Sequence, residues 1–179
     1  MLAAGVALLS LVAAATLQAK LYQGHAKQLL QDEIQRAIVS KVTRLNTQTK
    51  EDDVLGRLDI PRIGVSVAVL QGTGSRTLRL GVGHIESTSF PWDSGNIGIA
   101  GHRDTFFRPL RDIRKRDEIQ LQTAEGLFHY QVDWIKVVTP DDVSVLAPST
   151  ESVLTLVTCY PFQFLGAAPK RLIVRAHRY

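Results

Sequence analysis

The chain has 179 residues, of which 45% are hydrophobic and 21% are charged, which is the composition of a folded globular protein and excludes a disordered one. Lysine and arginine outnumber aspartate and glutamate by 21 to 17, and no nucleic-acid-binding motif accompanies the net charge of +4. A single cysteine excludes an internal disulfide framework and a cysteine-rich zinc site. The length suits one domain of ordinary size with shorter flanking segments.

The N-terminal segment is uncharged and apolar. Residues 2–19, LAAGVALLSLVAAATLQA, are just long enough to cross the core of a bilayer as a helix. We expect a membrane anchor over residues 1–19. A cleaved signal peptide is the alternative, because Ala13-Ala14-Ala15 offers a small-residue cleavage site, although no basic residue precedes the apolar run. Either segment would place the remaining chain outside the cytoplasm.

Residues 20–53 are expected to form an amphipathic stalk helix followed by a polar linker. Apolar side chains recur at every fourth position, as in a helix with one apolar face, at Leu30, Ile34, Ile38 and Val42. The helix could also pack on the domain that follows it. Residues 43–53, TRLNTQTKEDD, are almost entirely polar and predict the linker.

From residue 54 the pattern is one of short strands separated by turns that contain glycine and proline. Residues 126–138, GLFHYQVDWIKVV, alternate with the period of a strand that has one buried face, so Phe128, Tyr130, Val132 and Trp134 are expected on the same side. Further strand-like runs lie at residues 96–101, 153–158 and 171–177. Residues 105–113 allow one or two helical turns, interrupted by Pro109. The pattern predicts an all-β domain with short helices over residues 54–179, closed into a barrel.

Cys159 is placed where the predicted strand 153–158 ends and a loop begins. A free cysteine is most often a small buried hydrophobic residue, and it becomes a nucleophile only beside a base or a cationic partner. His102 ends the predicted strand 96–101 in the same way. Strand ends on a rigid barrel are suitable places for functional groups to converge, so His102 is the candidate partner of the thiol.

Arg171 is a third candidate, because it opens the last predicted strand after the loop that follows Cys159. An arginine stays cationic and offers several donors, which suits a site where negative charge develops. We expect Arg175 and Arg178, in contrast, to be solvated on the surface of that strand.

Three segments carry these candidates, and they are GIAGHRDTFFRPL at 98–110, TLVTC at 155–159 and APKRLIVRA at 168–176. They resemble, in the same order, the histidine segment, the TLxTC motif and the arginine strand of sortases, the membrane-anchored cysteine transpeptidases of bacterial surfaces. TLVTCYPF followed by GAAPKR is most similar to the class D branch. The resemblance covers residues 56–177 and implies a closed eight-stranded sortase-type β-barrel.

The resemblance implies a role for each matching residue. Cys159 would attack the backbone carbonyl of an LPxTG-like sorting signal between Thr and Gly, His102 would protonate the leaving amine, and Arg171 would bind the substrate and stabilise the oxyanion. The thioester would pass to an amine, such as that of a peptidoglycan precursor or a pilin lysine. The implied location is the outer, extracytoplasmic or periplasmic, side of the cell membrane. We expect no cofactor, no metal requirement and no nucleic-acid partner.

Four further residues could contact the substrate, namely Thr158, His84, Phe162 and Phe164. The hydroxyl of Thr158 could serve the site or simply pack. His84, in GVGHIEST, matches a GxGH segment of related sortases, and it could equally be a structural histidine. The aromatic residues of the loop 160–170 could form a wall for an apolar substrate residue or a cap on the barrel. Asp104 could orient His102 or cap the following turn.

Other functions remain as alternatives. A papain-like hydrolase has its cysteine before its histidine, the reverse of the order in this chain, and the Ser/Gly-rich run of L,D-transpeptidases is absent. The alternative from a different class is a non-catalytic, membrane-tethered β-domain that binds a surface or pilus partner. That alternative predicts that replacing Cys159, His102 or Arg171 leaves binding nearly unchanged.

Overall fold

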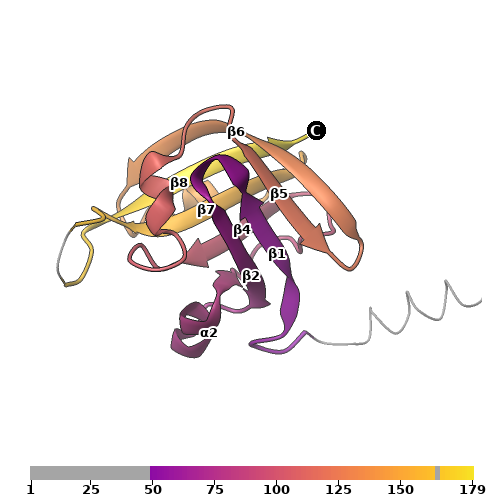
Figure 1. The fold of residues 1–179 in the computed structure, drawn as a ribbon, viewed down its shortest axis with the longest axis horizontal. Helices are drawn as coiled ribbons and strands as arrows, with labels where there is room; N and C mark the ends of the chain where they lie inside the picture. Colours follow the sequence, from indigo (N-terminus) through magenta and orange to yellow (C-terminus); the bar gives the residue numbers. More distant parts are fainter. Residues whose placement is uncertain (1–48, 164–165) are drawn as a thin grey trace, which may run out of the picture. The chain divides into compact units, whose positions relative to one another are not determined.

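The computed structural model describes residues 49–163 and 166–179 (Figure 1). The expected anchor at 1–19 and the stalk helix with most of its linker lie outside the described residues. Thr49–Tyr179 forms a compact unit of its own. Across the part that is described, no helix has both the length and the apolar character needed to cross a membrane.

Within the described residues, eight strands close into a barrel in the order β1-β2-β3-β4-β7-β8-β6-β5, which confirms the expected all-β barrel. The strands are β1 (Val54–Ile60), β2 (Val65–Gln71), β3 (Val82–His84), β4 (Asn96–Gly101), β5 (Glu118–Thr123), β6 (Gly126–Val138), β7 (Val153–Tyr160) and β8 (Lys170–Arg178). Most neighbours pair antiparallel, whereas β2 with β3 and β4 with β7 pair parallel. The parallel pair β4–β7 brings the carboxyl ends of two distant segments together.

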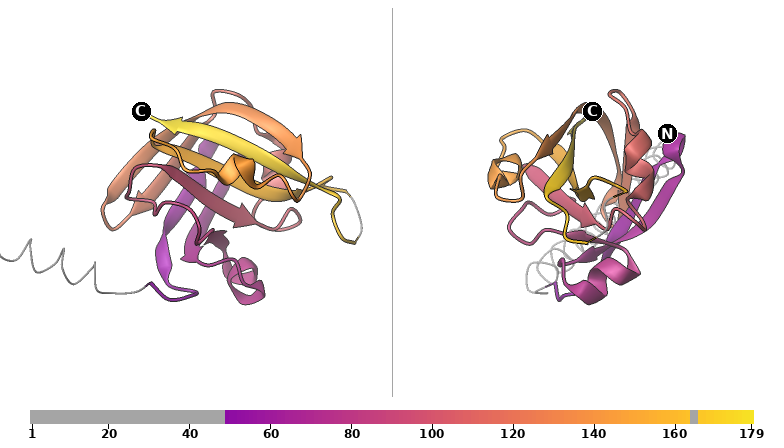
Figure 2. Two further views of the ribbon diagram at one scale, coloured as in Figure 1. Left: turned by 180° about the vertical axis from the view of Figure 1, so that it is seen from behind. Right: turned by 90° about the vertical axis from the view of Figure 1, so that its left-hand side faces the viewer.

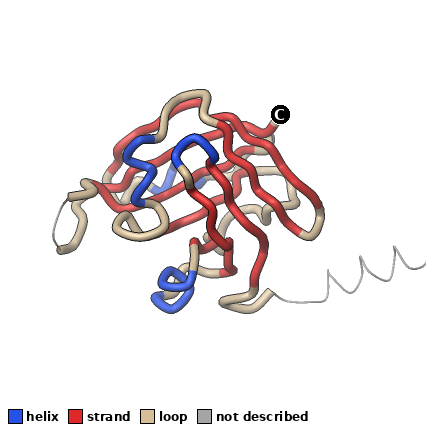
Figure 3. The backbone as a smooth tube through the Cα atoms, viewed as in Figure 1, coloured by secondary structure: helices blue, strands red, loops and turns tan. Residues whose placement is uncertain are grey.

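Short helical segments connect the strands, as the blue parts of the tube in Figure 3 show. They are η1 (Pro61–Ile63), α2 (Ser75–Leu80), η2 (Arg108–Asp112) and η3 (Val143–Leu146). The helical turns predicted between residues 105 and 113 are observed as η2, with Pro109 in its first turn. Proline is tolerated there because the first N–H groups of a helix have no partner within it.

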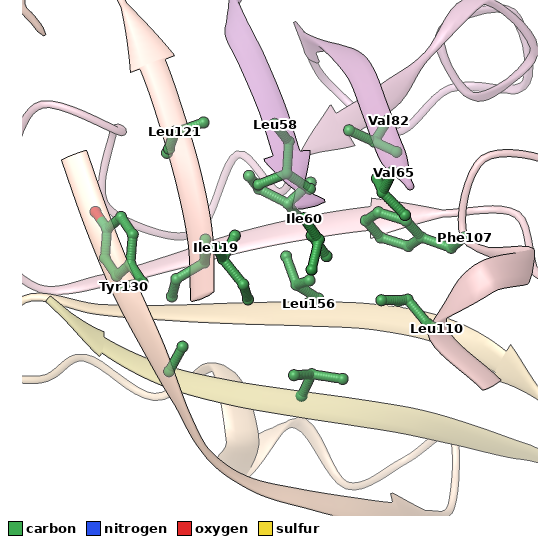
Figure 4. Packing of buried hydrophobic residues seen from close by; sticks show 14 of the residues in the cluster. Leu58, Ile60, Val65, Val82, Phe107, Leu110, Ile119, Leu121, Tyr130 and Leu156 are labelled. Atoms are coloured by element: carbon green, nitrogen blue, oxygen red, sulfur yellow. The ribbon is translucent and has the colours of Figure 1, made fainter. Parts of the chain in front are cut away.

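Aliphatic side chains fill the barrel together with Phe107 and Tyr130, both fully buried (Figure 4). The alternation predicted for β6 holds as far as Val132, which is 1% exposed. The expected burial of Trp134 on the same face is wrong, because the pairing register with β8 shifts between Val132 and Trp134. Such a bulge reverses the faces of the residues beyond it, so Ile135 packs against the core instead.

Candidate active site

His102, Cys159 and Arg171 lie at the same end of three neighbouring strands. The parallel ladder pairs Gly101 of β4 with Thr158 of β7, so His102 follows at the level of Cys159. The antiparallel ladder pairs Cys159 directly with Arg171 of β8. Neighbouring strands are about 4.8 Å apart, so the register brings the three backbones side by side. The three residues that the sequence singled out are therefore brought together.

Alternation along the strands directs these side chains to the outer face of the barrel. The core cluster contains Leu154 and Leu156 of β7 and Leu172 and Val174 of β8, so the residues between them face outward. Cys159 and Arg171 belong to this outward set, and both are partly exposed. The thiol is thus accessible although most of the residues before it on β7 are buried.

The Arg171 guanidinium is held near its own strand by backbone carbonyl groups. Its Nη1 atom donates to the carbonyls of Ala168 and Lys170, at 3.2 and 3.0 Å. Among the described residues, no hydrogen bond joins the side chains of His102, Cys159 and Arg171 to one another, so donors remain for a bound substrate. Catalytic hydrogen bonds often tighten only in the substrate complex.

Thr158 supports the site from inside the barrel wall. It is 2% exposed, and its Oγ1 atom donates to the Gly101 carbonyl at 2.7 Å. This bond joins the residue before Cys159 to the residue before His102. Its burial does not support direct contact with a substrate, and the geometry instead favours a role in holding β4 and β7 in register.

His84 is completely buried in the wall formed by β2, β3 and β4. Its ring nitrogens lie 2.9 Å from Gln71 Oε1 and 2.9 Å from the Ser89 carbonyl oxygen, and its ring stacks on Phe90 at 5.1 Å. Burial lowers the pKa of His84, against a smaller opposing effect of the Ser89 hydrogen bond. This environment favours the structural alternative for His84 over contact with a substrate.

The loop after Cys159 begins as a cap on one end of the barrel. Phe162 packs against the core and meets Tyr160 edge-on, with ring centroids 6.1 Å apart. The two rings line a pocket of about 330 Å³ with apolar neighbours on η2, β6 and β8, including Leu110, Ile135 and Leu172. Phe162 thus both packs on the core and lines a pocket, so its contact with a substrate stays a prediction. Phe164 lies outside the described residues.

Arg103, which the sequence analysis did not single out, links the histidine segment to the loop after Cys159. Its Nη1 atom donates to the Pro161 carbonyl at 3.0 Å and its Nη2 atom to the Gly166 carbonyl at 2.9 Å. Its position directly after His102 is the only signal that could have identified it. Asp104 is exposed, and within the described structure it neither bonds to His102 nor caps the following turn.

The expectation that Arg175 is solvated is wrong. Its Nη1 atom donates to Thr155 Oγ1 at 2.8 Å and to the Val145 carbonyl at 3.1 Å. The β6–β7 connection, residues 139–152, covers this part of β8 and partly buries the guanidinium. Burial lowers the pKa of Arg175, and the nearby carboxylates of Asp133 and Glu151 oppose that shift.

Comparison with known proteins places this geometry in a family. A model of the sortase domain matches residues 58–179. The chain is similar to Sortase D of Bacillus subtilis, with 39% identity over 124 residues that cover 69% of this chain and 63% of that protein. It is also similar to Sortase A of Listeria monocytogenes, with 29% identity over 132 residues that cover 72% of this chain and 59% of that protein. The chain spans less than two thirds of the length of either relative.

A solved structure extends the similarity to the fold. The Sortase D5 transpeptidase of Clostridium perfringens superposes with a TM-score of 0.69 at 30% identity, covering 78% of this chain and 88% of that one. The family match includes all three candidate residues, His102, Cys159 and Arg171. The chain belongs to the sortase family.

Proposed function

We propose that the protein is a cysteine transpeptidase that cleaves an LPxTG-like sorting signal between Thr and Gly and transfers the acyl part to an amine. The observation that carries this proposal is the register of β4, β7 and β8, which places His102, Cys159 and Arg171 at one end of three adjacent strands. Membership of the sortase family and the accessible position of the single thiol support it.

In the first step, the Cys159 thiolate attacks the carbonyl carbon of the Thr residue and forms a C–S bond. The C–N bond to Gly breaks, and the His102 imidazolium gives its proton to the leaving amine. The acyl group is then held as a thioester. In the second step, an incoming amine attacks this thioester and loses a proton to His102, while Cys159 leaves as the thiolate.

Arg171 is positioned to act in both steps because it lies directly opposite Cys159 across the antiparallel ladder. A neighbouring guanidinium favours the thiolate over the neutral thiol. Its N–H donors can also bind the oxygen that becomes negatively charged when the carbonyl is attacked. The first effect depends only on positive charge, which lysine would keep, whereas the second uses the planar pair of donors, which lysine does not provide.

The proposal extends to location and acceptor. The uncharged run at residues 2–19 would anchor the protein in the cell membrane by a single helix, with the catalytic domain on the outer side. The acceptor amine would belong to a peptidoglycan precursor or to a pilin lysine. The sorting signal would be carried by a surface protein of the same cell.

The test uses the full chain, purified in detergent, with an LPxTG-containing peptide and triglycine. Mass spectrometry should find the N-terminal part of the peptide joined to triglycine, and an acyl adduct on Cys159 when triglycine is omitted. Cys159→Ala should give neither product. Cleavage that persists in Cys159→Ala would refute the proposal, as would a peptide library that the wild-type protein binds but never cleaves, which is the behaviour of a binding domain.

A further inference from the structure

A strongly basic segment begins six residues after His102, in the connection between β4 and β5. Residues 108–116, RPLRDIRKR, contain five basic side chains and one acidic one, which gives a net charge of +4. The whole chain also has a net charge of +4, so its positive excess is concentrated in these nine residues. All five basic side chains are exposed, and we call them the basic face: Arg108, Arg111, Arg114, Lys115 and Arg116.

A spacing of three residues directs the arginines of this segment away from the barrel. Three apolar residues with that spacing are buried in the core, namely Phe107, Leu110 and Ile113. Side chains three residues apart share a face of a 3₁₀ helix, so Arg108 and Arg111 lie together on another, exposed face of η2. In the right-hand view of Figure 2, the salmon coil of η2 lies on the flank of the barrel away from the orange turn η3.

The turn after η2 keeps a basic side chain where glycine would be favoured. The Asp117 N–H donates to the Arg114 carbonyl at 3.1 Å, which closes a turn with Lys115 and Arg116 at its tip. Arg116 has a φ of 73°, a left-handed conformation that disfavours residues other than glycine. Residues that break a local rule are expected at functional or strained sites. This position therefore favours a function for the Arg116 side chain over a role in the turn itself.

The nearest carboxylates leave most of the basic face unpaired. Asp117 is 7% exposed, and it accepts hydrogen bonds from the Arg62 side chain and from the Arg114 backbone N–H. Asp112 pairs with Arg111 alone, at 3.3 Å, and both side chains are exposed, so the pair is weak. Within the described residues, no ion pair involves the other four basic side chains.

The chemistry of the basic face fits a surface of phosphate groups. Guanidinium groups bind phosphate oxygens through paired N–H donors. A protein partner would be expected to meet apolar side chains at the centre of the interface. In the described part of the chain, none of the large apolar side chains that are exposed belongs to residues 104–116. The proposed anchor holds the domain beside a membrane, whose lipid headgroups carry phosphate.

We propose that the basic face docks the catalytic domain on the anionic lipid headgroups of the membrane. Leu110 and Arg111 line the pocket of about 330 Å³ together with Tyr160 and Pro161, which follow Cys159. Docking therefore holds the end of the barrel that carries the candidate site close to the membrane surface. The inference rests on the proposed membrane location, and it is independent of the chemistry assigned to Cys159.

The test follows the acylation of Lys115 in the full chain, reconstituted into nanodiscs. One set of nanodiscs contains phosphatidylcholine alone, and the other contains one quarter phosphatidylglycerol, which is anionic. Mass spectrometry after a pulse of an acylating reagent gives the rate at each lysine. At low salt Lys115 should react about tenfold more slowly in the anionic nanodiscs, and about 0.5 M salt should abolish this protection. Lys50, exposed outside the basic face, is the internal reference and should change less than about twofold.

Paired variants test whether the protection comes from the basic face. Each basic residue near an anionic surface strengthens association about fivefold, so Arg108→Gln with Arg114→Gln should reduce the protection to below about twofold. The matched control, Arg57→Gln with Arg79→Gln, removes the same charge at other exposed positions and should retain the protection. Arg116→Gly should reduce the protection to about threefold without lowering the melting temperature, because glycine adopts this φ without strain.

Equal acylation rates in the two kinds of nanodisc would overturn the docking inference, and so would a control variant that loses the protection equally. Protection of Lys115 by soluble polyphosphate but not by anionic nanodiscs would assign the basic face to an anionic polymer and overturn it as well. A full chain that does not insert into nanodiscs would refute the proposed location, and the docking would fail with it. Docking without turnover of any peptide would support the inference while refuting the proposed transpeptidase.

Discussion

Replacing Thr158 by valine tests whether this residue positions the site or contacts the substrate. The substitution removes the 2.7 Å hydrogen bond to the Gly101 carbonyl at a residue that is 2% exposed. Valine fills nearly the same volume, so no cavity adds to the cost. Losing one buried hydrogen bond and leaving its acceptor without that donor should reduce the free energy of unfolding by about 1.5 kcal/mol.

That loss should lower the melting temperature of a domain of this size by about 5 °C, measured by calorimetry. Because Gly101 precedes His102, kcat should fall about tenfold while KM changes little. Thr158→Ser retains the hydroxyl, so its melting temperature and its kcat should both stay close to the wild-type values. A Thr158→Val protein with unchanged stability and a raised KM would refute this reasoning and make Thr158 a contact of the substrate.

Three other predictions concern the charge network, the core and the site. Asp117 is buried, and a hydrogen bond from Arg62 is the main reason that its pKa lies below the usual range. The ionised carboxylate therefore stabilises the fold at pH values above its unfolded pKa, and this stabilisation is lost as the pH falls through the lower pKa of the folded state. Asp117→Asn should therefore flatten the acid side of a stability-versus-pH curve from chemical denaturation, and an unchanged curve would contradict this. The Tyr130 hydroxyl is buried without a partner among the described residues, and burial raises its pKa to about 12. Tyr130→Phe should therefore leave the free energy of unfolding unchanged, and a loss above about 1 kcal/mol would reveal a partner. Arg171→Lys should lower kcat for peptide cleavage about a hundredfold, since it keeps the charge but loses the planar donor pair, and activity near the wild-type value would exclude that role for the guanidinium.

The convergence of the three candidate residues could be predicted because it depends on local signals. His102 and Cys159 each end a short apolar strand, and Arg171 begins one. Once the boundaries of these strands are known, the pairing between the strands is enough to place the three residues at one end of the barrel. The sequence could not show that β4 and β7 pair in parallel. The resemblance to a known family implied only that the three residues act together in a closed barrel.

The features that were missed depend on contacts between distant segments. Arg175 alternates correctly with its neighbours, and only the β6–β7 connection, which crosses over it, makes it part of a buried network. Trp134 continues the alternation of β6 in the sequence, but a bulge changes its face. The burial of His84 similarly depends on Gln71 and Ser89, which close around it from other segments.

The position of β8 between β6 and β7 couples the integrity of the barrel to that of the site. This strand of nine residues pairs on both sides, with β6 along one edge and with β7 along the other. A chain that lost it would lose Arg171, and it would also expose two long strand edges whose N–H and C=O groups have no partner. Such edges pair readily with other chains. Damage to one short segment would therefore remove part of the candidate site and leave an aggregation-prone protein.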